Sequence, residues 1–267
     1  MPRGICALCK RNADLQDSHL IPKGVYKALR EPDHVIPNPV LVTASVTLQT
    51  SDQVHDHLLC RVCELLFEQN GEDWVLKNGP QRDGRFPLRE ALMRSPVRTS
   101  IAAGYIFKEP LDASFDLERL IYFAASVFWR ASVHPWNGSE HLMSRAPLPE
   151  RIEEQLRRFL LHLDGFPLDT SLLLSVSAGV SPRPHCIFPQ AMVRASENVP
   201  EIDAYGFAIP GLQFRFMYDR VPDHMKEVSV VNPPYAVLLS DRTEKEIFDS
   251  AQRLQETTRL VGSLAKM

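Results

Sequence analysis

Two short cysteine motifs decide the fold of this chain: Cys-Ala-Leu-Cys at residues 6–9 and Cys-Arg-Val-Cys at residues 60–63. In each motif two residues separate the cysteines, a spacing at which both thiolates can bind one metal ion. Two such motifs supply the four ligands of a tetrahedral zinc site. The sequence therefore predicts a structural zinc ion held by Cys6, Cys9, Cys60 and Cys63. Disulfides or a redox motif are the alternative, but no βαβ pattern of the kind that surrounds redox motifs is present.

The two motifs are further apart than in a simple zinc ribbon. Residues 10–59 separate them, whereas a ribbon needs about 15–20 residues, so an additional segment is inserted. Prolines make residues 20–39 mostly irregular, and the β-branched stretch 40–50 predicts a strand. The second motif leads into a helix that we expect to stop near Gly71.

Composition favours a folded protein. The chain has 267 residues, of which 44% are hydrophobic and 24% are charged, so it can bury a sizeable core in two domains or one elaborated domain. Cys186 is far from the other cysteines. No apolar run is long enough to span a membrane and no signal peptide is evident, so we expect a cytoplasmic protein without a membrane partner. The formal net charge of −3 gives no global basic field, although a local patch would be enough to bind nucleic acid.

The rest of the chain mixes helical and strand periodicities. Helical spacing covers residues 114–133, a second helix opens at 149–150 and stops at Gly165, and a last helix runs from Thr243 to Val261. Strand patterns cover residues 172–178, 185–195, 205–209, 212–218 and 235–239, with a hairpin turn at 210–211. The predicted class is therefore α+β.

Candidate chemistry lies close to the cysteines. His19 follows Cys9 by ten residues, and a neutral imidazole near a zinc-held helix can accept a proton from water, although a structural histidine is the plain alternative. Glu64 and Glu68 are one helical turn apart, and two such carboxylates can hold Mg²⁺ or Mn²⁺. A solvated acidic helix face is the alternative here.

Together these residues resemble a known family. The first motif, the Ser-His-Leu-Ile-Pro stretch at 18–22 and the Leu-Cys-Arg-Val-Cys-Glu stretch at 59–64 are similar to the HNH (ββα-metal) endonucleases in their zinc-bound, treble-clef form. The resemblance covers about the first 70 residues. It implies that His19 is the general base and that Glu64, with Glu68 in some subclasses, binds the catalytic divalent ion. More loosely, a Trp-Arg-Ala-Ser stretch at 129–132 resembles bacterial HNH-like proteins, some of them components of antiviral and restriction systems.

The composition and the motifs divide the chain into three segments. An HNH-like zinc module covers residues 1–76, a basic Pro/Gly-rich connection covers 77–113, and an α+β regulatory or partner-binding domain covers 114–267. A zinc-stapled ββα-metal module would then be followed by a helical segment and a mixed α+β part.

Two departures from the family pattern affect the expected site. Ser18 stands where the family has a metal-binding acid before the base histidine, and Asp17 is the candidate substitute because it shares a strand face with His19. The family's asparagine before the second motif has no clear match, although His55, Asp56 and His57 lie nearby.

Basic residues indicate where a phosphate backbone could bind without sequence readout. The candidates are Lys23, Lys27, Arg30 and the arginines of residues 82–98, chiefly Arg82, Arg85 and Arg89. A solvated linker would explain the arginines equally well.

Three hypotheses follow. The first is a metal-dependent endonuclease that hydrolyses DNA, with RNA as another possible substrate and a regulatory protein or a second copy as a possible partner. The second is a non-catalytic zinc module that binds nucleic acid or protein. The third is a zinc-stapled scaffold whose C-terminal part binds a ligand or protein; residues 201–250 are net acidic, which suits a protein interface better than DNA.

Overall fold

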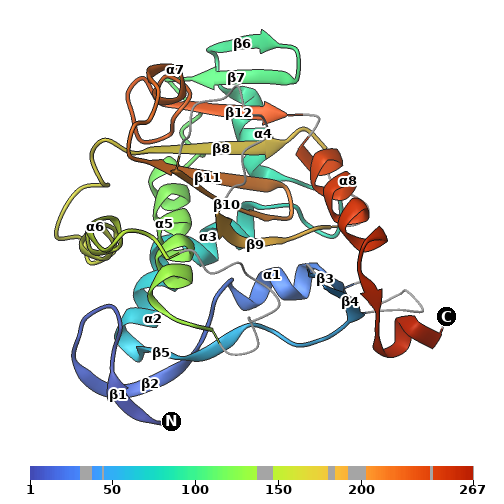
Figure 1. Ribbon diagram of the computed structural model, residues 1–267. Coiled ribbons are helices and arrows are strands. Elements are labelled where there is room, and N and C mark those ends of the chain that lie inside the picture. Colours follow the sequence, from blue (N-terminus) through green and yellow to red (C-terminus); the bar gives the residue numbers. More distant parts are fainter. Residues whose placement is uncertain are drawn as a thin grey trace.

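The structure is a computed structural model of the chain, which describes residues 1–30, 38–43, 45–136, 147–179, 184–191, 203–240 and 243–266. It is a mixed α+β fold in which one large sheet lies above a small hairpin module that contains the N-terminus (Figure 1). None of the described helices is long and apolar enough to cross a membrane.

The N-terminal module consists of a three-stranded sheet and a helical stretch. The sheet has the order β1-β2-β5 and is antiparallel, with strands β1 (Arg3–Ile5), β2 (Asn12–His19) and β5 (His55–Cys60). The helical stretch is α2 (Arg61–Phe67), a π-helical turn η1 (Glu68–Glu72) and α3 (Asp73–Asn78). Between β2 and β5 lie helix α1 (Lys23–Ala28) and strands β3 (Val40–Val42) and β4 (Val46–Gln49).

The large sheet has seven strands in the order β6-β7-β12-β8-β11-β10-β9. Its strands are β6 (Arg98–Ile101), β7 (Gly104–Lys108), β8 (Ser171–Ser177), β9 (Ile187–Ala191), β10 (Asp203–Ile209), β11 (Leu212–Tyr218) and β12 (Ala236–Ser240). Neighbours are antiparallel except β12 and β8, which are parallel. The predicted hairpin is confirmed: Ile209 pairs with Leu212 across a turn in which Gly211 has a φ of +79°.

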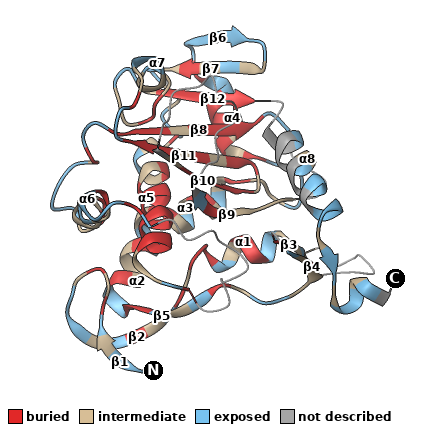
Figure 2. Cartoon of the chain, viewed as in Figure 1, coloured by how far each residue is buried: buried red, intermediate tan, exposed pale blue. Residues whose placement is uncertain are grey.

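Helix α5 (Leu117–Val133) connects the sheet to the N-terminal module. It confirms the helix predicted at 114–133, and its N-cap Asp116 accepts a hydrogen bond from the Arg119 amide. Phe123 and Phe128 pack against phenylalanines of β10 and β11. Most of this helix is buried (Figure 2), which explains why apolar residues surround it.

The remaining elements lie around this core. They are α4 (Pro87–Arg94), α6 (Glu150–Leu160), α7 (Asp223–Lys226), α8 (Thr243–Glu256), β13 (Arg259–Leu260) and the 3₁₀ turn η3 (Gly262–Lys266). Residues 77–113, expected as a connection, contribute α4, β6 and β7. Buried apolar residues between Cys6 and Leu239 belong to one continuous cluster.

Several boundary predictions were wrong, and the reasons are local. The stretch 40–50 is not one strand, because the Thr43 hydroxyl accepts hydrogen bonds from the amides of Ser45 and Val46 and turns the chain between β3 and β4. Residues 20–39 are not wholly irregular, since they contain α1; residues 31–37 lie outside the described part. The helix that starts at 150 ends at Leu160, where His162 adopts a φ of +56°.

Two further helix ends differ from the prediction. The helix after the second cysteine motif does not stop at Gly71, because this glycine lies inside η1 and faces the backbone of α5. The last helix ends at Glu256, so Val261 lies beyond it, after β13 has paired with β4. Of the strand predicted at 185–195, β9 covers 187–191 and residues 192–195 lie outside the described part.

Candidate functional site

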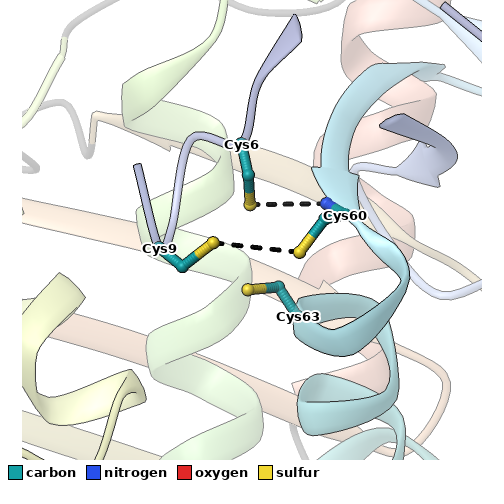
Figure 3. A group of neighbouring side chains, drawn as sticks. All are labelled: Cys6, Cys9, Cys60 and Cys63. Carbon is teal, nitrogen blue, oxygen red and sulfur yellow. Dashed lines mark hydrogen bonds between the residues drawn. The ribbon is translucent and has the colours of Figure 1, made fainter. Parts of the chain in front are cut away.

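The four cysteines of the two motifs meet at one point (Figure 3). Cys6 and Cys9 lie in the turn between β1 and β2, Cys60 ends β5, and Cys63 lies in the first turn of α2. Their sulfur atoms are all within 4.8 Å of one another, and the Sγ atoms of Cys9 and Cys60 are 3.8 Å apart. In the part of the chain that the structure describes, no other group of three or more His, Cys, Asp or Glu side chains is close enough to hold a metal ion.

The cysteine geometry fits zinc. A tetrahedral site with Zn–S bonds of about 2.3 Å has sulfur–sulfur distances of about 3.8 Å, which is the distance between the Cys9 and Cys60 sulfurs, and all four sulfurs lie within 4.8 Å of one another. All four thiols are free, which disagrees with the disulfide alternative, and only Cys9 is partly exposed. The hydrogen bond with the Cys63 thiol lowers the pKa of Cys6 to about 4, whereas the same contact raises the pKa of Cys63 and burial raises that of Cys9, so Cys6 is the thiol that deprotonates first. The four residues would hold the ion and leave no open coordination position.

Backbone contacts hold the first motif in place. The Cys60 amide lies 3.3 Å from the Cys6 sulfur, and the Ala7 amide donates to the Leu58 carbonyl at 3.1 Å. Arg157 of α6 donates to the Leu8 carbonyl at 2.8 Å. The turn that carries two zinc ligands is therefore attached both to β5 and to a helix from the second half of the chain.

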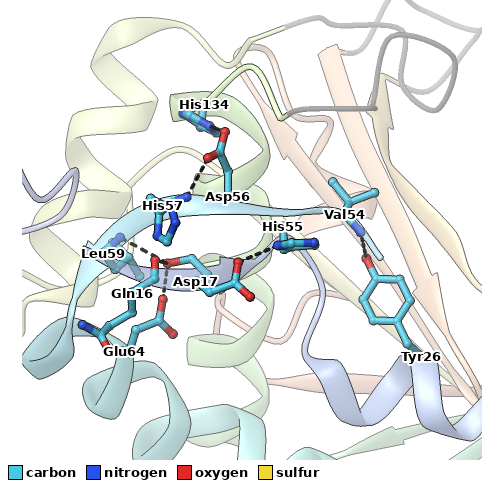
Figure 4. A network of polar contacts seen from close by, with 11 residues as sticks. Gln16, Asp17, Tyr26, Val54, His55, Asp56, His57, Leu59, Glu64 and His134 are labelled. Carbon is cyan, nitrogen blue, oxygen red and sulfur yellow. Dashed lines mark hydrogen bonds and ion pairs between the residues drawn. The ribbon is translucent and has the colours of Figure 1, made fainter. Parts of the chain in front are cut away.

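One side of the β2–β5 pair carries three histidines and an aspartate. Asp17 lies opposite His57, and His19 lies opposite His55, so all four side chains project from the same side. We call these four residues the histidine face. Asp17 Oδ1 is 2.5 Å from His55 Nδ1 (Figure 4), and the His55 ring stacks on the His19 ring with centroids 5.4 Å apart. Asp17, His55 and His57 are exposed, and His19 is partly buried.

The surroundings of His19 keep its ring neutral. Burial lowers the pKa of His19 below its ordinary value of 6.5, and the positive charges of His55 and Lys23 lower it further, while Asp17 opposes the shift. A neutral imidazole is the form that can accept a proton at physiological pH. His19 therefore has the protonation state that a general base requires.

The other side of the same strands faces helix α2. The buried Ser18 hydroxyl donates a hydrogen bond to the Glu64 carboxylate and accepts one from the Leu59 amide at 3.1 Å. Burial raises the pKa of Glu64, and the Ser18 hydroxyl and Arg130 partly offset this shift. Glu64 thus lies between the hairpin and the helix, on the opposite side from His19.

A buried arginine completes this junction. Arg130 of α5 is 1% exposed and donates to the His19 carbonyl at 2.8 Å and to Glu72 Oε1 at 2.6 Å. It also donates to the Ser126 carbonyl at 3.2 Å and lies over the Phe67 ring. The arginine of the Trp-Arg-Ala-Ser stretch therefore connects strand β2, turn η1 and helix α5.

The candidate ligands of a catalytic divalent ion are not brought together. Glu64 is bound to Ser18, Glu68 is exposed in η1, and Asp17 lies on the histidine face beside His55. Asp17 and Glu64 lie on opposite sides of the strand pair, and among the described residues these three carboxylates do not form a group close enough to hold one Mg²⁺ or Mn²⁺ ion.

The basic candidates divide into two groups. Lys23 and Lys27 are exposed on α1, and Arg82 donates to the Lys27 carbonyl at 3.3 Å, so these three follow one helix, and the charge of Lys23 acts on His19. Arg85 is instead paired with Asp83, and Arg89 donates to the Ala178 carbonyl.

Sequence reasoning did not identify two contacts. Asp56 Oδ2 lies 2.9 Å from His134 Nε2, which ties β5 to the end of α5 (Figure 4), and this contact lowers the pKa of Asp56. Glu72 pairs with Arg130. Both join residues more than 50 positions apart, and only the charged side chain of Arg130 in an apolar helix could have indicated such a partner.

Comparisons with known proteins give no relative for this chain: no family model matches it, and neither a curated protein nor a solved structure is significantly similar.

Proposed function

We propose that the chain is a nuclease of the HNH type that hydrolyses phosphodiester bonds in DNA, with His19 as the general base. In support, the zinc-binding turn is followed by β2, then β5, then helix α2, with α1, β3 and β4 inserted between the two strands, which is compatible with a ββα module. In this proposal zinc has no chemical role, and it holds the strand pair against α2.

The single observation that carries the proposal is the environment of His19. A neutral, partly buried imidazole lies on an exposed strand face, with a carboxylate–histidine pair on one side and the Lys23 ammonium close by. His19 would take a proton from water as the water attacks a phosphate. The Asp17 carboxylate would stabilise the imidazolium that forms, and Lys23 would attract the phosphate.

No step is assigned to a divalent ion, because Asp17, Glu64 and Glu68 do not converge, and the ion requirement is therefore tested directly. A role in an antiviral or restriction system rests on the family resemblance alone.

The second candidate is a zinc module that binds nucleic acid or a protein without cleaving it. The specific observation in its favour is the direct hydrogen bond between Ser18 and Glu64. These are the two positions at which the family pattern has metal ligands, and here each side chain satisfies the other.

Nicking of a supercoiled plasmid decides between the two candidates. Zinc-loaded wild type is incubated with Mg²⁺, with Mn²⁺ or with neither, beside His19→Ala and the control His224→Ala, which changes an exposed histidine of α7. The nuclease proposal expects wild type and the control to nick and His19→Ala to lose at least ~100-fold in rate, with zinc retained in all three. Nicking that survives in His19→Ala excludes this base, and DNA binding without nicking favours the second candidate.

A further inference from the structure

Helix α1 presents an unneutralised row of positive charge beside His19. Lys23 and Lys27 are both exposed and are four residues apart, so they project from one side of the helix with a rise of about 6 Å between them. The helix lies next to the histidine face, since the rings of Tyr26 and His19 are 6.2 Å apart and the charge of Lys23, at the start of the helix, acts on His19. Lys23 is the end of the row nearest to His19.

The position of α1 is fixed by its packing. A Cβ on Gly24 would lie 2.6 Å from Leu76 Cδ1, so the helix is in close contact with α3 at this point. On its inner side, Val25 and Tyr26 are buried, and the Tyr26 hydroxyl accepts a hydrogen bond from the Val54 amide at 3.1 Å. The lysines therefore extend from a rigid support.

A third cation joins the row at its far end. Arg82 lies in the turn formed by residues 81–84, where Gly84 has a φ of +86° and its amide donates to the Gln81 carbonyl. This turn directs Arg82 to the Lys27 carbonyl, at 3.3 Å. We call Lys23, Lys27 and Arg82 the α1 row.

The α1 row differs from the other basic residues in its surroundings. Within the described part of the chain, no carboxylate lies within ion-pair distance of any of its three members, whereas Arg85, Arg94 and Arg151 each pair with an aspartate. A paired arginine contributes little net attraction to a phosphate, and an unpaired cation contributes fully.

We infer that the α1 row is a phosphate track that holds the backbone of a nucleic acid strand and leads it onto the histidine face at His19. This inference rests on the proposed function and specifies how its substrate is held. Three exposed cations that follow α1 contact phosphates and read no bases, so binding is independent of sequence. It is also weak and strongly dependent on salt, because each phosphate contact releases bound counterions.

The test measures binding without cleavage. The fluorescence anisotropy of a labelled 20-base-pair DNA duplex is measured while zinc-loaded protein carrying His19→Ala is added. The corresponding single strands of DNA and RNA are measured in the same way. The test variant adds Lys23→Gln, Lys27→Gln and Arg82→Gln. The matched control adds Arg151→Gln, Lys226→Gln and Lys245→Gln, which remove three cations that are ion-paired elsewhere.

For duplex DNA, three phosphate contacts contribute about −2.7 to the slope of log K against log salt concentration, or an approximately 40-fold loss of affinity between 50 and 200 mM salt. The expected result is that the test variant loses most of this slope and the control keeps it. The inference is overturned if the slope and the Kd of the test variant stay within twofold of those of the His19→Ala protein. It is also overturned if the control variant changes by the same amount, or if the His19→Ala protein binds none of the probes at 50 mM salt. Binding through the track by a chain that never nicks DNA would reject the proposed nuclease and retain the track.

Discussion

His19 shows how much the chemistry of one residue depends on its surroundings. From the sequence it was a single histidine close to a cysteine motif, and its role as a base depended on its being neutral. In the structure its ring is partly buried, stacks on His55 and has Asp17 on the same strand face. The free energy of protonating this ring is therefore set by residues from both strands of the pair, β2 and β5.

A titration of His19 tests this environment. Because burial lowers its pKa, His19 should titrate below 6.5 when its ring proton signals are followed by NMR in zinc-loaded protein. The unfolded chain then binds a proton at this position at a higher pH than the folded chain does. Above pH 6.5 the ring is neutral in both states and the free energy of unfolding is unaffected by it. As the pH falls from 6.5 towards the pKa of His19 in the folded chain, protonation of the unfolded chain lowers the free energy of unfolding. Urea unfolding of His19→Gln should show a weaker pH dependence between pH 7 and 5, and an unchanged dependence would contradict the shift.

Arg130 is the second residue whose role depends on distant partners. Replacement by Met keeps most of the side-chain volume but leaves Glu72 and the His19 carbonyl without their donor. Breaking a buried ion pair from one side costs about 3–5 kcal/mol, so Arg130→Met should lower the free energy of unfolding by that amount in urea titrations. Adding Glu72→Gln should recover part of the loss, because the partly buried carboxylate that Arg130→Met leaves without its partner is then removed as well. A loss below ~1 kcal/mol would show that the pair is not important for stability.

At the scale of elements, the cysteine spacing was sufficient to predict the cluster, because a metal site imposes its own distances on the chain. The hairpin of β10 and β11 was predictable from strict alternation around Pro210-Gly211.

Other features depend on partners far away in the sequence. Gly71 is typical of a helix end, but a Cβ there would lie 2.9 Å from the Phe123 amide nitrogen, so the glycine permits close approach of η1 to α5. Likewise, Glu64 and Asp17 are separated because Glu64 of α2 contacts the Ser18 side of β2, whereas the Asp17 side chain projects from the other side of that strand.

Gly71 offers a test of this contact. Gly71→Ala should destabilise the chain by about 1–3 kcal/mol, because the new methyl group meets backbone atoms that cannot rotate away. Gly165→Ala is the matched control, since nothing lies within 4 Å of the position of its added Cβ. Thermal and urea unfolding of both variants measure the difference. Equal stabilities would mean that η1 and α5 are not in close contact in solution.

Zinc content tests the cysteine cluster. Elemental analysis of purified protein should give one zinc per chain for wild type and for Cys186→Ser, because Cys186 is not part of the cluster. Cys60→Ser and Cys63→Ser should each bind zinc far more weakly and lose most of it to a chelator, because three thiolates remain. Full zinc retention in either variant would assign the metal to other residues.

At the scale of the whole molecule, α5 joins the zinc-binding module to the large sheet (Figure 1). Its buried residues contact Phe67 of α2 on one side and Phe207 and Phe216 of the sheet on the other. The hydrogen bond between Asp56 and His134 and the hydrogen bond from Arg157 to the Leu8 carbonyl add two further links. Composition alone could not distinguish two domains from one elaborated domain, because that depends on how these faces are paired.

A shared core predicts that the two parts unfold together. On heating, the release of zinc to a colorimetric dye and the loss of amide protection in β8 and β11 should have the same midpoint, because unfolding of either part exposes the buried face of α5. Phe128→Ala removes a ring that packs on Phe207 and Phe216 of the sheet and should lower both midpoints equally, with a cost of about 3–5 kcal/mol. Zinc release that keeps its wild-type midpoint in Phe128→Ala would show that the zinc-binding module is an independent folding unit. The histidine face would then be held by the metal alone, whereas coincident midpoints mean that the position of His19 also depends on the packing of the sheet against α5.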